Sequence, residues 1–461
     1  MMRVFEFLVA LVIVAVIGVL AAVVMPGSGH VERQLVMGKD LRQVYDVLDN
    51  FRRLPDYSVL RSLDPNVQFK FSGKAFGPGA EISWTSTDAK LGDGGLTVAS
   101  ATPDFDKIDN NTQDATIVWN LDNNWRGLDK HFTLDMERQG HGRLTQVTWS
   151  YDVKYGWNLV NRFANLYIHG DPDSFIEFSL NNLQNVLAGV ANVDYSGLMP
   201  RIVQSQPAPV LFVTRHIDRS KGGTEALDDI MSQADTELRA EAKKLGVNVT
   251  GSSILFITNY GDPDFDFEVA LPIDSSTLTV NGQSEQLTPP TPPTLAAAQP
   301  AEASTAAGAA DASGPAAGSR DRFGRLVVEG DVRAMLAFGG ATLQGDWDGT
   351  FNGVPQTVKM LTAYAQTHGY KFDSTVSAPY DTVVTPAVKD ASGGFVSYAK
   401  HQVSLPLSEA PAQTPEQEAG LQPASAGTAS GPAASGSAPA TPGSAPAPAG
   451  SAAPAAAGSA E

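Results

Sequence analysis

The first hydrophobic block of the chain runs from Phe7 to Met25 and carries no charge, no proline and one glycine. At about 19 residues it is long enough to cross a hydrocarbon core, which takes roughly 17–25. A cleaved signal peptide is the alternative, but its apolar core is shorter and ends at a small-residue cleavage site that is missing here. A soluble core helix would show a polar face. The pattern therefore predicts an uncleaved span, with residues 1–29 as a membrane anchor.

The charges around this block do not fix its orientation, because Arg3 precedes it and Arg33, Lys39 and Arg42 follow it. A very short N-terminal tail usually stays in the cytoplasm. We therefore expect a single-pass protein of a bacterial inner membrane, with most of the chain in the periplasm.

Alternating apolar and polar positions dominate residues 30–193. A strand is expected at 31–37, and the spacing of Leu41, Val44 and Leu48 predicts a helix from about Asp40. Six further alternating runs predict an antiparallel sheet with one wet face; they begin at Val67, Ala80, Gly94, Ala115, Leu128 and Arg143.

A long helix is expected to close this segment. Asp171 is placed at its N-cap and Pro172 at its first helical position. An apolar stripe then follows at helical spacing, formed by Ile176, Leu180, Leu183, Leu187 and Val190.

Residues 204–283 and 320–408 each contain the pattern strand, helix, strand, strand. One helix is expected from Thr224 to a capping glycine at 246, and the other from Pro355 to a capping glycine at 369. Their last strands read alike, FEVALPID and HQVSLPLS. We predict a tandem β-α-β-β repeat domain whose second copy begins with RLVVEGDVRAMLAFGG and whose apolar faces pack together. The predicted class is α+β.

Two segments are rich in Ala, Pro, Gly and Ser: 284–319, inside the repeat domain, and 409–461, at the end of the chain. Neither carries enough apolar surface to offset the entropy of ordering, so both are predicted to be disordered.

Composition narrows the classes of function. The 461 residues fit two or three domains, and the formal net charge of −18 disfavours a nucleic-acid partner. The absence of cysteine excludes disulfides, thiolate metal sites, lipoprotein anchoring through cysteine and cysteine nucleophiles.

The first domain resembles the START-like helix-grip superfamily, also known as polyketide cyclase/dehydrase. The resemblance covers about Val31 to Leu187 and rests on four motifs: LRQVYDVLDNFRRLPDYSVLRSLDP, FSGKAFGPGAEISWTS, RLTQVTWSYDV and DSFIEFSLNNLQNVL. It implies an antiparallel sheet wrapped on the long C-terminal helix, around a cavity for an apolar molecule or lipid. The superfamily includes lipid carriers, cyclases and plain binders, so it does not fix the function.

The tandem domain resembles the gyrase-inhibitor-like, or effector-binding, domain. The residues that carry this resemblance are FEVALPID, QTVKMLTAYAQTHGY and SAPYDTV. The family usually has a pocket glutamate two residues before a tyrosine, and it attracts cationic drugs. Tyr380 matches the tyrosine, but Ala378 stands at the glutamate position. The resemblance therefore implies a ligand groove without its usual cation-binding carboxylate.

The candidate ligand-binding residues are aromatic, with one carboxylate, because small-molecule sites are mostly apolar with a few polar groups. Ordinary core packing is the alternative for the aromatic residues, and a side chain that points to solvent is the alternative for Glu268. In the first domain they are Trp84, Trp119, Trp149 and Tyr151, and in the second Tyr260, Glu268, Phe338, Trp347, Tyr364 and Tyr380.

No phosphate-binding, hydrolase or zinc-protease motif is present, and no cofactor is expected. Asp262, Asp264 and Asp266 alternate in YGDPDFDFE, but a solvated hairpin is expected there rather than a calcium site. The sequence thus predicts a membrane-anchored, non-catalytic protein that binds a hydrophobic small molecule. A cyclase- or hydrolase-type enzyme, or a scaffold without ligands, is the alternative.

Overall fold

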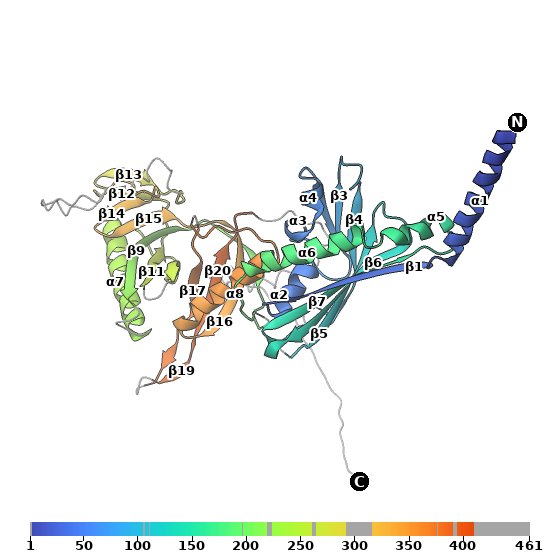
Figure 1. The fold of residues 1–461 in the computed structure, drawn as a ribbon. Helices are drawn as coiled ribbons and strands as arrows, with labels where there is room; N and C mark the ends of the chain where they lie inside the picture. Colours follow the sequence, from blue (N-terminus) through green and yellow to red (C-terminus); the bar gives the residue numbers. More distant parts are fainter. Residues whose placement is uncertain are drawn as a thin grey trace, which may run out of the picture. The chain divides into compact units, whose positions relative to one another are not determined.

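The structure is a computed structural model. It describes residues 2–104, 107–109, 111–195, 197–218, 224–260, 264–291, 316–375, 377–390 and 394–409. The chain begins with α1 (Met2–Val24), whose window Val4–Val24 has a mean hydropathy of 3.3 and is almost entirely exposed (Figure 1). By length and composition this helix can cross a membrane, or serve as a signal sequence. Most of the predicted disordered insert, and residues 410–461 of the tail, lie outside the described residues.

The first domain contains a seven-stranded antiparallel sheet in the order β1-β7-β6-β5-β4-β3-β2. The first strand therefore pairs with the last, as the pairing of Leu35 with Val147 illustrates. The strands are β1 (Ser28–Met37), β2 (Gln68–Gly73), β3 (Ala80–Thr85), β4 (Gly94–Thr102), β5 (Asp114–Asp122), β6 (Leu128–Gln139) and β7 (Leu144–Lys154).

Helices connect and cover this sheet. α6 packs on β1 and β7 and contacts α3. The helices are α2 (Leu41–Leu48), α3 (Leu54–Tyr57), α4 (Leu60–Leu63), α5 (Leu159–Arg162) and α6 (Asp171–Ala188), with single turns η2 (Gly140–Gly142) and η3 (Phe163–Tyr167). The alternation expected for the strands is observed; in β5, for example, Ala115, Ile117, Trp119 and Leu121 are all buried.

The predicted start of the long helix is wrong by one residue. Gly170, not Asp171, occupies the N-cap, and Asp171 and Asp173 lie in the first turn. Both carboxylates are well placed there, because the N-terminal end of a helix carries partial positive charge. Arg33 of β1 donates to Asp173 at 2.7 and 2.8 Å, which joins this turn to the sheet.

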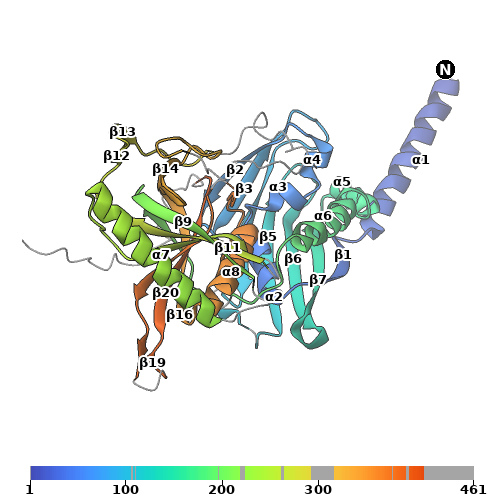
Figure 2. The ribbon, with the colours of Figure 1, turned by 90° about the vertical axis from the view of Figure 1, so that its left-hand side faces the viewer.

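The second domain contains a nine-stranded antiparallel sheet in the order β14-β15-β9-β11-β10-β17-β20-β16-β8. α7 packs on β9 and β11, and α8 on β16 and β20 (Figure 2). The elements are β8 (Arg201–Ser205), β9 (Pro209–Asp218), α7 (Thr224–Leu245), β10 (Ile254–Tyr260), β11 (Asp264–Pro272), β14 (Leu326–Glu329), β15 (Val332–Leu336), β16 (Gly340–Gly349), η5 (Phe351–Gly353), α8 (Val354–Thr367), β17 (Tyr380–Thr385) and β20 (Ala399–Pro406).

The α+β class with antiparallel sheets is confirmed, but the expected start of the second copy is wrong. The segment RLVVEGDVRAMLAFGG forms the hairpin β14–β15, which pairs with β9 of the first half. The strand that precedes α8 is instead β16. The repeated order of strand, helix, strand, strand placed the opening strand of the second copy here, but pairing in the sheet joins this hairpin to β9 of the first half.

The expected insert 284–319 is ordered at both ends. β12 (Thr277–Val280) and β13 (Gln283–Gln286) form a hairpin, and Leu287 is buried directly after it. At the other end, the Gly318 amide donates to the Val327 carbonyl at 2.8 Å. Apolar residues at the edges of this low-complexity segment therefore join the folded domain. A further hairpin, β18 (Val388–Lys389) and β19 (Phe395–Ser397), precedes β20.

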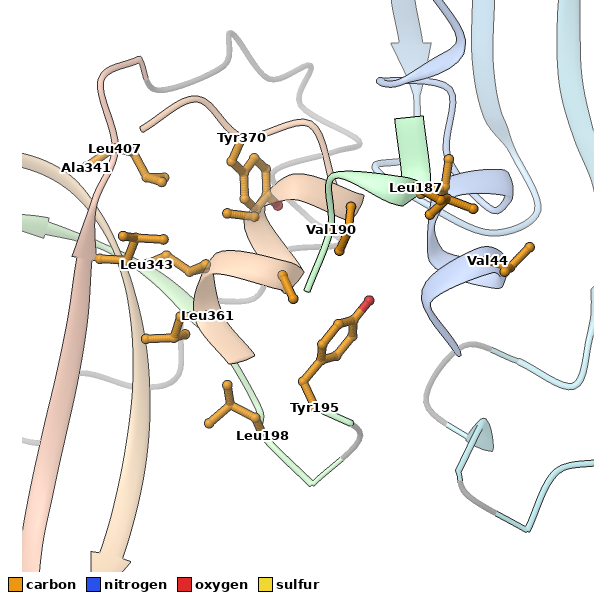
Figure 3. Close-up of a cluster of buried hydrophobic side chains, with 14 of the residues drawn as sticks. Val44, Leu187, Val190, Tyr195, Leu198, Ala341, Leu343, Leu361, Tyr370 and Leu407 are labelled. Atoms are coloured by element: carbon orange, nitrogen blue, oxygen red, sulfur yellow. The ribbon is translucent and has the colours of Figure 1, made fainter. Parts of the chain in front are cut away.

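The two domains meet at a shared core. Tyr195, in the segment between the domains, lies between α2 and α8, and Leu198 lies near Leu361 on the other side of α8 (Figure 3). The Tyr195 hydroxyl donates to Asp46 Oδ2 at 2.9 Å and lies 3.0 Å from Thr367 Oγ1. One hydrophobic cluster thus continues from the first domain into the second.

Candidate functional site

A cleft of about 1340 Å³ lies on the face of the nine-stranded sheet that the helices leave open. Its position follows from the alternation of side chains along each strand. In β11, Phe267 and Val269 point toward α7 and are buried, so Glu268 between them points to the opposite face. The cleft therefore lies across the sheet from the helices.

One row of side chains crosses this open face. The strand register pairs Thr214 with Glu268, Glu268 with Phe256, and Phe256 with Tyr380. Neighbouring strands are about 4.8 Å apart, so Glu268 and Tyr380 lie about 10 Å apart on the same face. The row continues from Tyr380 through Ser404 to Gln344.

The floor of the cleft is apolar. Phe256 and Met335 belong to a small cluster on this face that also contains Val210, Phe212, Ala270 and Ala337, with Ala378 and Tyr380 packed against it. The rings of Phe256 and Tyr380 are 5.6 Å apart. Phe338 forms part of the wall, and its neighbour Gly339 already lies against Pro207. A flat apolar body fits such a floor.

A buried charged group lies at one end of the floor. Arg325 Nη1 donates to Glu268 Oε1 at 2.5 Å, and Arg325 Nε donates to Asp321 Oδ2 at 2.6 Å. The guanidinium also lies 4.8 Å from the ring centres of Phe212 and Phe323. Burial raises the pKa of Glu268, and Arg325 counteracts the rise by favouring the charged form.

The lining is balanced in charge. Four arginines, at 320, 322, 325 and 333, face four carboxylates, Asp266, Glu268, Asp321 and Asp331. The formal charge of the described lining is therefore zero, in a chain whose net charge is −18. Such a lining favours a neutral or zwitterionic amphiphile over a strongly charged one.

The structure brings together only part of the second set of candidate residues. Glu268 and Phe338 line the cleft, and Tyr380 packs against its floor. Tyr260 packs on Phe265, which faces away from Glu268 because the two are an odd number of residues apart on one strand.

Trp347 and Tyr364 also lie outside the cleft. The Trp347 indole donates to the Thr350 carbonyl at 2.9 Å and rests against Gly353, on the side of α8. The Tyr364 ring stacks on His368 at 3.8 Å and meets Tyr195 at 5.6 Å, at the junction between the domains. The expectation that these side chains meet in one groove is therefore wrong for Tyr260, Trp347 and Tyr364.

Three candidates of the first domain form its core. Trp84, Trp119 and Trp149 are almost completely buried, and the last two meet edge to face at 5.3 Å. The Trp119 indole donates to the Leu48 carbonyl at 3.1 Å, which joins the sheet to α2. These rings line neither the cleft nor a smaller cavity of the first domain.

That smaller cavity, of about 480 Å³, lies at the end of the first domain, beside α5 and the start of α6. Tyr151 lines it, together with Trp125 at a ring distance of 5.4 Å. Lys90 and Arg126 bring positive charge to the same lining. Of the first-domain candidates, Tyr151 alone contacts this space.

Several buried polar atoms of the first domain have no hydrogen-bond partner among the described residues: Nε1 of Trp84 and Trp149, the hydroxyl of Tyr57 and Oγ of Ser179. Buried polar groups are normally paired, and leaving one unpaired costs about 1–3 kcal/mol. None of these four residues lines the cleft or the smaller cavity, so the unpaired atoms do not mark a binding site there.

An aligned acid–base pair is present, but away from both cavities. His401 Nδ1 lies 2.7 Å from Asp381 Oδ2, and both side chains are buried. Burial raises the pKa of Asp381, while the hydrogen bond with His401 lowers it again. Neither residue lines the cleft or the smaller cavity. The geometry thus gives this pair no route to a substrate in either space.

No metal-binding group of three or more His, Asp or Glu side chains occurs among the described residues. Of the alternating aspartates in YGDPDFDFE, Asp262 lies outside the described residues. Asp266 Oδ1 accepts from His216 Nδ1 at 2.7 Å, and its Oδ2 accepts from Asn259 Nδ2 at 3.3 Å. This carboxylate is thus engaged at a hairpin end, as expected for a solvated turn.

Arg325, Phe256 and Met335 are among the cleft residues that sequence reasoning missed. The alternation in DFDFEVALP places Glu268 on one face of its strand. The alternation in VRAML places Arg333 and Met335 together on one face of a different strand. The sequence does not show which strands are neighbours or in which register they pair. The pairing of Phe256 in β10 with Glu268 in β11 is seen only in the folded sheet.

Comparisons with known proteins give weak similarities. No protein-family model matches the chain, and no curated protein matches it. Among solved structures, the protein XoxI from Bacillus cereus is 13% identical over 35% of this chain and 96% of its own, with a TM-score of 0.25.

Two other solved structures match to a similar extent. Truncated norcoclaurine synthase from Thalictrum flavum is 11% identical over 36% of this chain and 96% of its own, with a TM-score of 0.25. Ara h 8.0201 is 11% identical over 35% of this chain and 99% of its own, with a TM-score of 0.24. Similarity at this level identifies neither a ligand nor a reaction.

Proposed function

We propose that this chain is a membrane-anchored protein that binds a small apolar or amphiphilic molecule without transforming it. The observation that carries the proposal is the cleft on the open face of the second domain. Its volume is large enough for a drug-sized ligand, and its apolar floor with a few fixed polar groups is the usual make-up of a small-molecule site.

The resemblance to effector-binding domains supports a ligand site in the same cleft. Ala378, just before β17, lines the cleft, and Tyr380 at the start of β17 packs against its floor, where that family binds its ligands. Ala378 replaces the usual glutamate, and Arg325 pairs with Glu268, so neither of these positions offers an unpaired carboxylate to a cation. The proposed ligand is therefore a neutral or zwitterionic amphiphile whose flat apolar part lies over Phe256 and Met335.

In this proposal α1 is an uncleaved span of a bacterial inner membrane, and the two domains lie on the periplasmic side. The length and hydropathy of α1 support the span. The START-like first domain, in turn, supplies a second and smaller cavity at its end nearest α1.

The proposal is tested by identifying what the protein carries. The full-length chain is purified in detergent, and solvent extracts are analysed by mass spectrometry. Ala378→Trp fills the floor of the cleft, whereas Val384→Trp places the same ring at an exposed position of β17.

A compound recovered from the wild type and from Val384→Trp, but not from Ala378→Trp, supports the proposal. The same extract from all three proteins, or no compound from any of them, contradicts it.

A further inference from the structure

Five apolar side chains stand exposed on the short segment between β7 and α6: Trp157, Val160, Phe163, Leu166 and Tyr167. We name this set the 157–167 patch. Trp157 is 82% exposed and Tyr167 is 74% exposed, which is unusual for such large side chains on the surface of a soluble protein. Trp157 lies just before the N-cap of α5, and the other four residues lie in the helical turns α5 and η3.

The patch is fixed to the end of α1. Arg162 Nη1 donates to the carbonyls of Val23 and Met25, at 3.0 and 3.2 Å. The amides of Tyr155 and Gly156 donate to the Gly27 carbonyl at 2.8 and 3.1 Å. The arginine also satisfies carbonyls at the negative end of the helix dipole. Figures 1 and 2 both show α5 next to this end of α1.

The length of α1 places this junction at a membrane surface. Its 23 residues rise by about 1.5 Å each, or about 34 Å in all, against a hydrocarbon core of about 30 Å. When α1 spans the bilayer, Val23 and Met25 therefore lie at the level of the lipid head groups. The patch, hydrogen-bonded to the same residues, lies at that level too.

The chemistry of the segment matches a lipid interface. Trp and Tyr concentrate at membrane–water boundaries, because their rings are apolar and their edges polar. Residues 155–170 contain no Asp, Glu or Lys, one Arg and one His, in a chain with a net charge of −18. Because this segment contains no acidic residue, it adds no repulsion from anionic lipids.

We propose that the 157–167 patch is a second membrane contact, inserted into the interface of the bilayer that α1 crosses. Val160, Phe163 and Tyr167 also line the cavity of about 480 Å³ in the first domain. The contact therefore places the rim of this cavity at the lipid surface, so that an amphiphile can enter the cavity from the bilayer. The inference rests on the proposed span by α1.

The absence of cysteine from the chain allows a direct test. Single cysteines replace Leu166 in the patch, Val14 in α1 and Val384 in the second domain, each at an exposed apolar position. The full-length variants carry a nitroxide spin label and are reconstituted into phosphatidylcholine–phosphatidylglycerol vesicles. Collision rates with oxygen, which concentrates in lipid, and with a water-soluble nickel complex then report the depth of each label.

We expect the label at 166 to collide with the nickel complex several-fold less often than the label at 384, and more with oxygen. The label at 14 is expected to be deeper still. If the label at 166 collides with the nickel complex as often as the label at 384, while the label at 14 remains deep, the patch is not in the membrane. In that case this inference fails and the proposed span by α1 stands. If the label at 14 also collides freely with the nickel complex, α1 does not span the bilayer, and the inference fails together with the proposed span.

Discussion

Single residues in buried places decide where this protein is sensitive to pH. Asp49, at the C-cap of α2, is 1% exposed, and its carboxylate oxygens have no hydrogen-bond partner among the described residues. Burial, reinforced by the charge of Asp46, raises its pKa to about 8. The folded state therefore holds a proton on Asp49 that the unfolded state releases near pH 4.

This proton makes stability fall as pH rises. Between about pH 4 and pH 8 the folded state binds more protons than the unfolded state, so the free energy of unfolding decreases with pH. Asp49→Asn removes the titration. We expect it to stabilise the protein on the order of 2–5 kcal/mol at pH 8, and little at pH 4. Denaturant unfolding at several pH values measures this, and an equal effect at pH 4 and pH 8 would contradict the account.

The pair Glu268–Arg325 is the charged element of the proposed site. Removing one partner of a buried pair leaves an uncompensated charge, which costs about 3–5 kcal/mol. We expect Arg325→Met to destabilise the protein by this amount, and the double variant Arg325→Met/Glu268→Gln to recover most of the loss. Chemical denaturation of the two variants measures the difference. Equal stability of the single and double variants would show that the two groups do not interact.

At the scale of elements, the sequence predicted those features that depend on local physics. Gly246 and Gly369 follow their helices as expected, with φ of +72° and +70°, where a side chain would be strained. The strands of the first domain also lie where alternation placed them. Local spacing and turn chemistry are sufficient for such features.

Other elements were not predictable, because they depend on partners distant in sequence. β8 pairs with β16 about 140 positions later, so that Val203 lies opposite Thr342. The β14–β15 hairpin joins β9 across the low-complexity insert. The cleft depends on these pairings, and aromatic residues alone could not distinguish its floor from the helix side of the same sheet.

Trp347 packs on the helix side of the sheet, where its role is structural. A Cβ added at Gly353 would lie 2.0 Å from the Trp347 ring, whereas one added at Gly38 would meet nothing within 4 Å. Overpacking of this kind costs about 1–3 kcal/mol. We expect Gly353→Ala to lower the thermal midpoint and to leave ligand binding intact, with Gly38→Ala as the matched control. A loss of ligand binding without a loss of stability would contradict this structural role and would show that Trp347 contributes to the binding site.

At the scale of the whole molecule, the shared core predicts that the domains unfold together. Tyr195 is fully buried between α2 and α8 and hydrogen-bonds to a residue of each. We expect a single calorimetric transition for the wild type and for Tyr195→Phe. Tyr195→Ala, which loses about 3–5 kcal/mol of packing, should separate the transition into two. Two transitions in the wild type would contradict a continuous core.

The central claim is that the second domain binds one small molecule in its open cleft. Native mass spectrometry of the full-length chain released from detergent, with N-phenyl-1-naphthylamine as a neutral apolar aromatic probe, tests it most directly. The account predicts one displaceable adduct per chain in the wild type and in Val384→Trp, and its loss in Ala378→Trp. No adduct in the wild type, or the same adduct in all three proteins, would contradict it.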